Sequence, residues 1–257
     1  MAHIPRKRFG QHFLTDAAVI ASILEAIRPR PADLMVEIGP GLGALTRPLL
    51  DCVAKLHVVE IDRDIVAHLA RAFPLERLAI HQADALQFDF GALGAEQRIV
   101  GNLPYNISTP LLFHLAGYAR SIRDIHVMLQ EEVVARMTAD RGQAEYGRLS
   151  VMLQHRFSVE RLLSVSPQAF RPPPKVDSAV VRMRPFASPD HCPETAFATL
   201  VKHAFMQRRK TLRNSLRNFL REEDFKALEI DPTARAQNLA VADYVRMANY
   251  VDKRARN

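Results

Sequence analysis

Short apolar segments alternate with amphipathic segments through the first half of the chain, and this alternation restricts the fold more than any other feature. The short segments are rich in β-branched residues, and helical spacing of apolar residues marks the stretches between them. Strands that are apolar on both faces belong to a parallel sheet covered by helices on both sides. The sequence therefore predicts a Rossmann-like, mostly parallel α/β fold with strands at residues 34–38, 56–61, 78–81, 99–101 and 125–129.

The pattern changes near residue 159. Two apolar runs, 159–165 and 178–183, lie too close together for a crossover helix of usual length, and the second run alternates. We expect them to form an antiparallel addition at the sheet edge. Pro185 and the Ser-Pro pair at 188–189 indicate a linker, after which the sequence looks entirely helical. The predicted division is a large α/β domain of residues 1–185 and a small all-helical domain of residues 186–257.

A glycine-rich turn follows the first predicted strand. Gly39, Gly41 and Gly43 have G-x-G-x-G spacing, which allows a sharp turn and lets a ligand lie against bare backbone. Glu60 ends the next strand, 21 residues after Gly39. A carboxylate there would accept hydrogen bonds from both hydroxyls of a ribose. A glycine turn alone often serves only packing, but this combination indicates a nucleoside-containing cofactor.

S-adenosylmethionine fits the pattern better than a nicotinamide dinucleotide. The third glycine falls one position early for the dinucleotide motif, and Pro40 is unusual in it. Glu37 suits a ligand with positive charge nearby, such as a sulfonium with its amino group, and Asp84 could bond an adenine amino group. One such acid is more often a solvated loop carboxylate. Acids at the ends of three successive strands favour a cofactor site, because ligands of open α/β sheets bind there.

The segment Gly101-Asn102-Leu103-Pro104-Tyr105-Asn106 is the most specific motif. Methylating an exocyclic adenine amine is difficult because its lone pair is delocalised into the ring. The Asn102 side-chain oxygen and the Leu103 carbonyl could accept both amine hydrogens and direct the lone pair at a methyl group. Pro104 would hold Leu103 extended, and Tyr105 would offer a face for the base. The motif predicts catalysis by positioning; the alternative is a turn beside a core tyrosine.

Residues 9–14, 37–43, 102–105 and 170–178 together resemble the KsgA family, the small-subunit rRNA adenine-N6,N6-dimethyltransferases. The match continues into residues 207–214, so it covers nearly the whole chain. The resemblance implies that His12, Leu14, Gly39, Glu60, Asp84 and Asn102 contact the cofactor. The predicted cofactor site also includes Gly41 of the glycine turn and Ala85 beside Asp84. Many relatives have Asn in place of His12.

The target adenine would be flipped out of its stack and held by Asn102, Leu103, Pro104 and Tyr105. Phe170 precedes three prolines, and a stiff loop suits a stacking wall, so we expect the base to lie between Tyr105 and Phe170. The alternative for Phe170, a core residue in a proline-rich connector, is about equally favoured without the resemblance.

Residues 202–221 contain seven basic residues and no acid. We expect one helix on which Arg209, Arg213, Arg217 and Arg221 are spaced by four. Such a stripe is usually a solvated helix face. Here the basic side chains would repel one another without nearby acids, which favours RNA phosphates as their partners. The predicted RNA-binding residues are Arg208, Arg209, Lys210, Arg213, Arg217 and Arg221, with a weaker contribution from residues 6–8.

The overall charge of +7 agrees with a polyanionic partner and is unevenly placed. Residues 1–185 hold 22 Lys and Arg against 19 Asp and Glu, whereas residues 186–257 hold 13 against 9. We therefore expect the first domain to supply the chemistry and the second to supply much of the binding to RNA.

The two cysteines, Cys52 and Cys192, are far apart and have no metal-ligand spacing. This excludes a disulfide framework, and we expect the protein to work in a reducing cytoplasm. We also expect it to bind no metal. No segment is apolar over the length that a membrane-spanning helix requires. A monomer is expected because no large apolar stripe is left unexplained.

The predicted function is S-adenosylmethionine-dependent dimethylation of the N6 amines of two adjacent adenines. The resemblance implies that these lie near the 3′ end of small-subunit (16S) rRNA in a pre-ribosomal 30S particle. One alternative is a large-subunit rRNA methyltransferase of the antibiotic-resistance type, which shares the site motifs. Its C-terminal helices differ, and residues 207–214 of this chain favour the small-subunit enzyme. Others are an adenine-N6 DNA methyltransferase and a ribosome-assembly factor that keeps the fold without depending on catalysis.

Overall fold

The computed structural model describes residues 12–187, 190 and 192–256. The basic residues 6–8, residues 9–11 of the 9–14 motif and the Ser-Pro pair at 188–189 therefore lie outside the described residues. The chain forms two compact units, residues 1–134 with 158–185, and residues 135–157 with 186–257. The second unit is larger than the helical domain expected from the sequence, because residues 135–157 group with the C-terminal helices.

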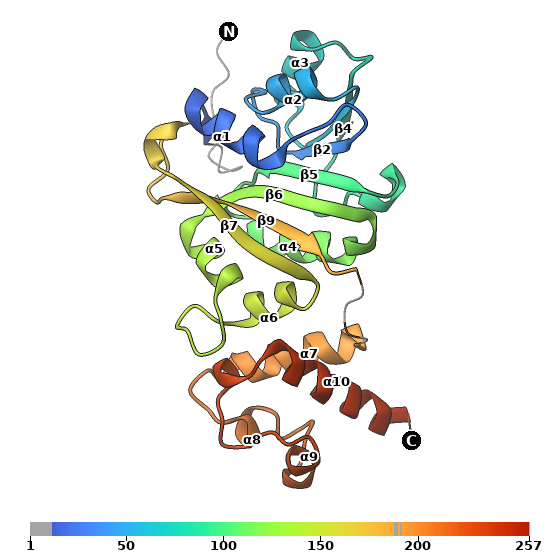
Figure 1. The fold of residues 1–257 in the computed structure, drawn as a ribbon, viewed down its shortest axis with the longest axis vertical. Helices are drawn as coiled ribbons and strands as arrows, with labels where there is room; N and C mark the ends of the chain where they lie inside the picture. The colour runs from blue at the N-terminus through green and yellow to red at the C-terminus, as the bar shows by residue number, and fades with distance from the viewer. Residues whose placement is uncertain (1–11, 188–189, 191, 257) are drawn as a thin grey trace. The chain divides into compact units, whose positions relative to one another are not determined.

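The first unit contains a seven-stranded sheet in the order β4-β3-β2-β5-β6-β9-β7 (Figure 1). The five strands from β4 to β6 are parallel, and β9 pairs antiparallel with β6. This arrangement confirms the predicted fold, including the late strands at the sheet edge. The bounds are β2 Leu34–Ile38, β3 Leu56–Glu60, β4 Leu78–Gln82, β5 Gln97–Asn102, β6 Ile122–Gln130, β7 Phe157–Val165 and β9 Ser178–Pro185.

Helices connect these strands and cover the sheet. Helices α1 Ala17–Ile27, α2 Thr46–Cys52 and α3 Arg63–Ala72 join one apolar cluster with β2 and β3, through residues such as Ile27, Leu49 and Leu69. Asp16 caps α1 by accepting from the Ala18 and Val19 amides. Helix α4 Ser108–Gly117 follows β5 and buries Leu111, Leu112 and Leu115, and α5 Glu131–Thr138 follows β6 directly along the chain.

A second, two-stranded sheet joins the start of the described chain to the proline-rich segment. Strand β1 Phe13–Leu14 pairs antiparallel with β8 Phe170–Arg171, and Leu14 lies opposite Phe170. The Thr15 amide also donates to the Ala169 carbonyl at 2.8 Å. These bonds hold residues 12–15 against the loop before β9.

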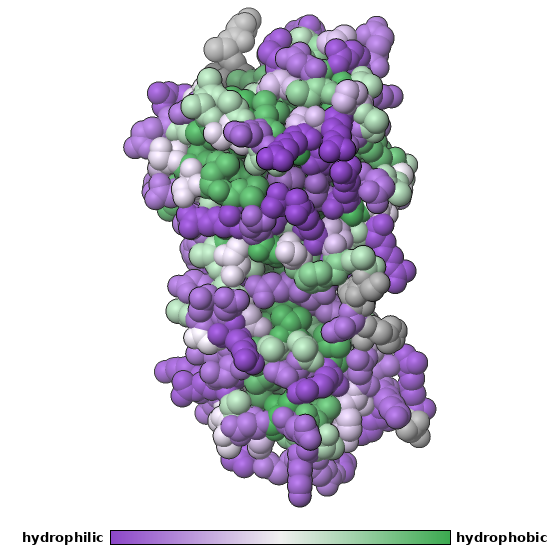
Figure 2. Space-filling view, in the orientation of Figure 1, coloured by the Kyte–Doolittle hydropathy of each residue, from purple (hydrophilic) through white to green (hydrophobic). Residues whose placement is uncertain are grey.

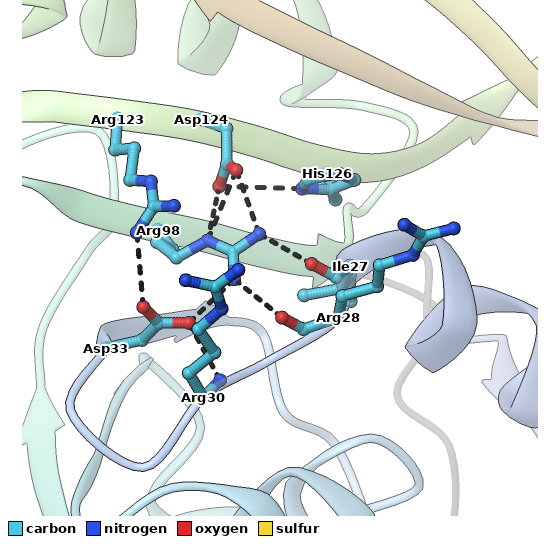
Figure 3. Close-up of polar contacts among 8 residues, drawn as sticks. All are labelled: Ile27, Arg28, Arg30, Asp33, Arg98, Arg123, Asp124 and His126. Carbon is cyan, nitrogen blue, oxygen red and sulfur yellow. Dashed lines mark hydrogen bonds and ion pairs between the residues drawn. The ribbon is translucent and has the colours of Figure 1, made fainter.

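Arg98, at the amino end of β5, is the centre of a buried polar network (Figure 3). Its guanidinium donates to both oxygens of Asp124 and to Asp33 Oδ2, and also to the carbonyls of Ile27 and Arg28. The side chains of Arg98 and Asp33 are each only 6% exposed. The network therefore joins α1, the start of β2 and two neighbouring strands without leaving a buried charge unpaired.

The second unit is helical, with α6 Arg148–Gln154, α7 Glu194–Met206, α8 Leu212–Ser215, α9 Glu222–Ala227 and α10 Val241–Arg256. Its core includes the completely buried Leu212 and Leu216. The continuous helix expected over residues 202–221 is wrong, because α7 ends at Met206. The Leu212 amide instead donates to the Ala234 carbonyl at 2.8 Å, and Thr211 forms a bridge with Arg235. These tertiary bonds replace the helical bonds that would continue α7.

Within the described residues, no helix is long and apolar enough to cross a membrane.

Candidate functional site

A cavity of about 860 Å³ opens at the carboxyl ends of β2, β3, β4 and β5. The topology brings the predicted motifs there, because parallel neighbours all end at the same edge of the sheet. Eleven of the predicted site residues line it: His12, Leu14, Gly39, Gly41, Glu60, Asp84, Ala85, Asn102, Leu103, Pro104 and Tyr105.

Two positions at this edge of the sheet require glycine, for different reasons. Gly39 has a φ of +67°, which side chains rarely adopt, and a Cβ there would lie 3.7 Å from the Asn102 carbonyl oxygen. Gly101 faces the neighbouring strand so closely that a Cβ would lie 2.4 Å from the Ile38 carbonyl oxygen. Gly39 therefore serves the turn through its positive φ, whereas the missing side chain of Gly101 is what lets the 101–106 motif pack closely against the end of β2.

Two acids of the cavity wall have raised pKa values. Burial raises the pKa of Glu37 to about 7, although the Thr46 hydroxyl donates to its Oε2 at 2.6 Å. Burial also raises the pKa of Glu60, against hydrogen bonds from the backbone amides of Asp62, Ile61 and Gly41. The wall can therefore stabilise positive charge, since a cation in the cavity would favour the ionised form of both acids.

Asp84 is only partly buried. Its Oδ1 accepts from the Leu86 amide at 2.9 Å, which fixes the carboxylate at the end of β4. The carboxylate thus remains accessible to a donor group in the cavity.

The Asn102 amide has a fixed orientation. Its Nδ2 donates to the His12 carbonyl at 2.8 Å. Its Oδ1 and the Leu103 carbonyl accept no hydrogen bond from the part of the chain that the structure describes. Both oxygens are therefore available to the two hydrogens of an amine, as the motif predicts.

Tyr105 is held from two sides. Its hydroxyl bonds to the Ser178 hydroxyl at 2.7 Å, and burial raises the pKa of the phenol. The His12 ring stacks on it with centroids 5.6 Å apart and an interplanar angle of 28°. His12 Nδ1 is 2.8 Å from the Pro172 carbonyl, so it must carry a proton to make that bond. One residue therefore orients both Asn102, through its backbone, and Tyr105, through its ring.

Phe170 does not form the wall expected from the sequence. Its side chain is 0% exposed and belongs to the apolar core with Leu14 and Val180. The pairing of β8 with β1 turns the ring inward, so the alternative of a core phenylalanine is correct in this structure. His12 is the aromatic neighbour that Tyr105 has instead.

The predicted RNA-binding residues lie in the second unit and are all exposed: Arg208, Arg209, Lys210, Arg213, Arg217 and Arg221. They are not a stripe on one helix, because the helix ends before them. Acids outside residues 202–221 also partner two of them, with Arg213 lying 3.8 Å from Glu222 and Arg221 lying 3.4 Å from Glu223. The repulsion inferred from the acid-free run is thus partly relieved.

Sequence reasoning missed the supporting residues Thr46, Ser178 and the Pro172 carbonyl. Ser178 ends the 170–178 motif, so its position in that motif was the available signal. The bonds of Thr46 and Pro172 depend on tertiary contacts that no local pattern encodes. No group of three or more potential metal-ligating side chains occurs among the described residues.

Comparisons with known proteins agree with this geometry. The family model for ribosomal RNA adenine dimethylase matches residues 2–253. A Laribacter hongkongensis protein named ribosomal RNA small subunit methyltransferase A is 62% identical and covers 96% of both chains. A Thiobacillus denitrificans protein of the same name is 59% identical, over 98% of this chain and 100% of the relative.

Two solved structures share the fold. A dimethyladenosine transferase from Plasmodium falciparum has a TM-score of 0.80 at 24% identity, covering 95% of this chain and 98% of that one. The 23S rRNA methyltransferase ErmE has a TM-score of 0.72 at 26% identity, covering 93% and 99%. With the family model matching nearly every residue, this chain belongs to the ribosomal RNA adenine dimethylase family.

Proposed function

We propose that this protein dimethylates the N6 amines of two adjacent adenines near the 3′ end of small-subunit rRNA, within a pre-ribosomal 30S particle. The observation that carries the proposal is the pair of acceptors, Asn102 Oδ1 and the Leu103 carbonyl, beside a cavity lined by buried acids. The names of the Laribacter hongkongensis and Thiobacillus denitrificans relatives support the choice of the small subunit.

S-adenosylmethionine is the proposed cofactor, and when bound it supplies a methyl group on a positively charged sulfur. The residues present fit it: Glu60 suits ribose hydroxyls, Asp84 suits an adenine amino group, and Glu37 contributes negative charge to the wall. His12, Leu14, Gly39, Gly41, Ala85 and Asn102 complete the proposed contact set. No metal is required by this chemistry.

Asn102 and Leu103 would accept the two amine hydrogens and so localise the nitrogen lone pair. Pro104 holds the Leu103 carbonyl in place, since its own carbonyl accepts from Ile107 N and from the Ser108 hydroxyl. Tyr105 would stack on the base, which must then displace or slide beside the His12 ring. Catalysis comes from this alignment, and no side chain needs to act as a tuned base.

Exposed basic residues of the second unit, from Arg208 to Arg221, are proposed to contact RNA phosphates. The proposal also places the protein in the cytoplasm as a monomer. An assembly role apart from methylation would be revealed if an Asn102 variant without activity still supported subunit maturation in cells.

The test is methyl transfer from labelled S-adenosylmethionine to immature small subunits, with large subunits offered separately. We expect dimethyladenosine in the small subunit only, and Asn102→Ala to lower the rate by roughly 10²–10³-fold, the usual cost of removing one positioned hydrogen-bonding group. No dimethyladenosine, or an undiminished yield with Asn102→Ala, would overturn the proposal. Modified large subunits would instead support the antibiotic-resistance type of enzyme.

A further inference from the structure

One face of the sheet in the first unit carries arginines in two layers. The inner layer is Arg98 on β5 and Arg182 on β9, and both are paired with acids. Arg98 bonds to Asp33 and Asp124, and Arg182 bonds to Glu160. Because these inner arginines occupy the carboxylates, little negative charge is left for arginines further out.

The outer layer is Arg28, Arg30 and Arg184, all exposed. None of the three forms a side-chain ion pair with any residue that the structure describes. Figure 3 places Arg28, Arg30 and Arg123 around Arg98, and Figure 2 shows strongly hydrophilic residues over this part of the sheet. The outward surface is therefore positive over a group of planar guanidinium groups.

His126 adds no negative charge to this face, and its Nδ1 lies 3.7 Å from Asp124 Oδ1. Its side chain is 2% exposed, and neither ring nitrogen has a hydrogen-bond partner among the described residues. Burial, with the charges of Arg98, Arg182 and Arg184, lowers the pKa of His126 to about 4, against the attraction of Asp124. The imidazole is thus neutral at pH 7. Six arginines (Arg28, Arg30, Arg98, Arg123, Arg182 and Arg184) then face three acids (Asp33, Asp124 and Glu160).

The strand register places Arg98, Asp124, His126 and Arg182 on one face. Backbone bonds bring Arg28 and Arg30 to it, since the Arg28 carbonyl accepts from Arg98 and the Arg30 amide donates to Asp33. Arg182 lies directly opposite His126 on the antiparallel pair, and Arg98 lies opposite Asp124 on the parallel pair. Directly opposed residues point to the same side of a sheet, and so do residues two apart on one strand. Arg184 therefore shares the face of Arg182, and its charge acts on His126.

We propose that this arginine face, formed by the outer-layer residues Arg28, Arg30 and Arg184, is a second RNA-binding surface that binds the phosphate backbone outside the cavity. The inference rests on the proposed function for the identity of the RNA. Guanidinium groups suit phosphate because their planar donors match two of its oxygens at once. Arg98 and Asn102 lie four residues apart on β5, about 13 Å of strand. An RNA that presents a base to Asn102 could therefore reach this face within a few nucleotides.

The experiment compares two double variants of the full chain. Arg30→Gln with Arg184→Gln removes two outer arginines, and Arg63→Gln with Arg71→Gln removes two exposed arginines of α3. A fluorescent RNA hairpin and immature small subunits are the probes, and each affinity is measured over a range of KCl concentrations. Neither pair belongs to the catalytic machinery, so S-adenosylmethionine affinity and kcat should be unchanged in both.

We expect the slope of log affinity against log salt concentration to fall by about two for the Arg30/Arg184 variant, about one for each phosphate contact. The Arg63/Arg71 variant should keep the wild-type slope, and Arg30→Lys with Arg184→Lys should restore most of the loss. Equal slopes for all variants would overturn the proposal. So would weaker binding to subunits with an unchanged slope for the hairpin, because the partner would then not be RNA.

These binding results do not depend on catalysis. If the wild-type protein methylates neither subunit while the Arg30/Arg184 variant shows a smaller salt slope than wild type, the proposed function is refuted and the arginine face still stands.

Discussion

Replacing Glu37 with Gln should stabilise the protein at neutral and alkaline pH, by an amount that grows with pH. Glu37 is 2% exposed, and burial raises its pKa from 4.5 to about 7. Above pH 4.5 the carboxyl of the unfolded chain ionises freely, whereas the folded protein holds it protonated until about pH 7. Folding therefore becomes less favourable across this window and reaches a constant deficit above it.

The size of the deficit follows from the two pKa values. The difference between 4.5 and about 7 corresponds to about 3 kcal/mol at pH 8 and to almost nothing at pH 4. A Gln at position 37 resembles the protonated acid and can still accept from the Thr46 hydroxyl. The stabilisation of Glu37→Gln relative to wild type should thus rise from near zero at pH 4 to about 3 kcal/mol at pH 8.

Urea unfolding monitored by circular dichroism between pH 4 and pH 8.5 measures this difference. A gain of about 3 kcal/mol should raise Tm by about 6–12 °C at pH 8 for a domain of this size. The matched control is Glu76→Gln, at an exposed position, and its difference from wild type in free energy of unfolding should not change with pH. If the difference in free energy of unfolding between Glu37→Gln and wild type stays constant with pH, or shrinks as pH rises, the reasoning is refuted.

The same substitution should weaken the cofactor site. A cation bound in the cavity favours the ionised form of Glu37, so binding of S-adenosylmethionine near pH 7 should release protons in wild type. Calorimetric titration in buffers of different ionisation enthalpy measures that release. Glu37→Gln should bind more weakly and release fewer protons while being the more stable protein.

The remaining predictions concern single contacts. Arg98→Met leaves Asp33 and Asp124 without their buried partner and should cost about 3–5 kcal/mol in urea unfolding, whereas a cost below 1 kcal/mol would contradict the network. Gly101→Ala should yield little folded protein because the added methyl would collide with the Ile38 carbonyl, while Gly117→Ala, with open space around it, should express normally. Tyr105→Phe loses only the Ser178 bond and should keep kcat/KM within about tenfold, whereas Tyr105→Ala also loses the stacking face and should fall further in the methylation assay.

The strands were predictable because each carries its own local signal. Segments 34–38 and 56–60 are bounded by turn residues and are mostly apolar, and the structure starts and ends them almost where the sequence indicates. The strand-end acids were equally predictable, because parallel strands present their carboxyl ends together. Thus the glycine turn, the strand-end acids and the 101–106 motif follow from local pattern and one topological rule, whereas His12 and Leu14 were expected only from the resemblance to the KsgA family.

The Arg98 network could not be predicted in this way. Its partners Asp33 and Asp124 are 65 and 26 residues away along the chain, and only the strand order brings them together. The prediction that Phe170 lines the cavity was wrong for a related reason. Whether an aromatic residue beside prolines faces a cavity or the core depends on which strand it pairs with, and β1 turns it inward.

The distribution of charge shows most clearly why counting along the chain misleads. Residues 1–185 are nearly balanced, yet Asp33 and Asp124 are buried against Arg98 while Arg30 and Arg184 face outward. An RNA contacts only the surface, and the charge exposed there on the first unit is more positive than the net charge summed over residues 1–185. The acid-free run 202–221 is conversely less unbalanced than it reads, because Glu222 and Glu223 follow it directly. If both corrections hold, binding to RNA is shared by the two units, and neutralising Arg30 with Arg184 should lower the salt slope as much as neutralising Arg209 with Arg217.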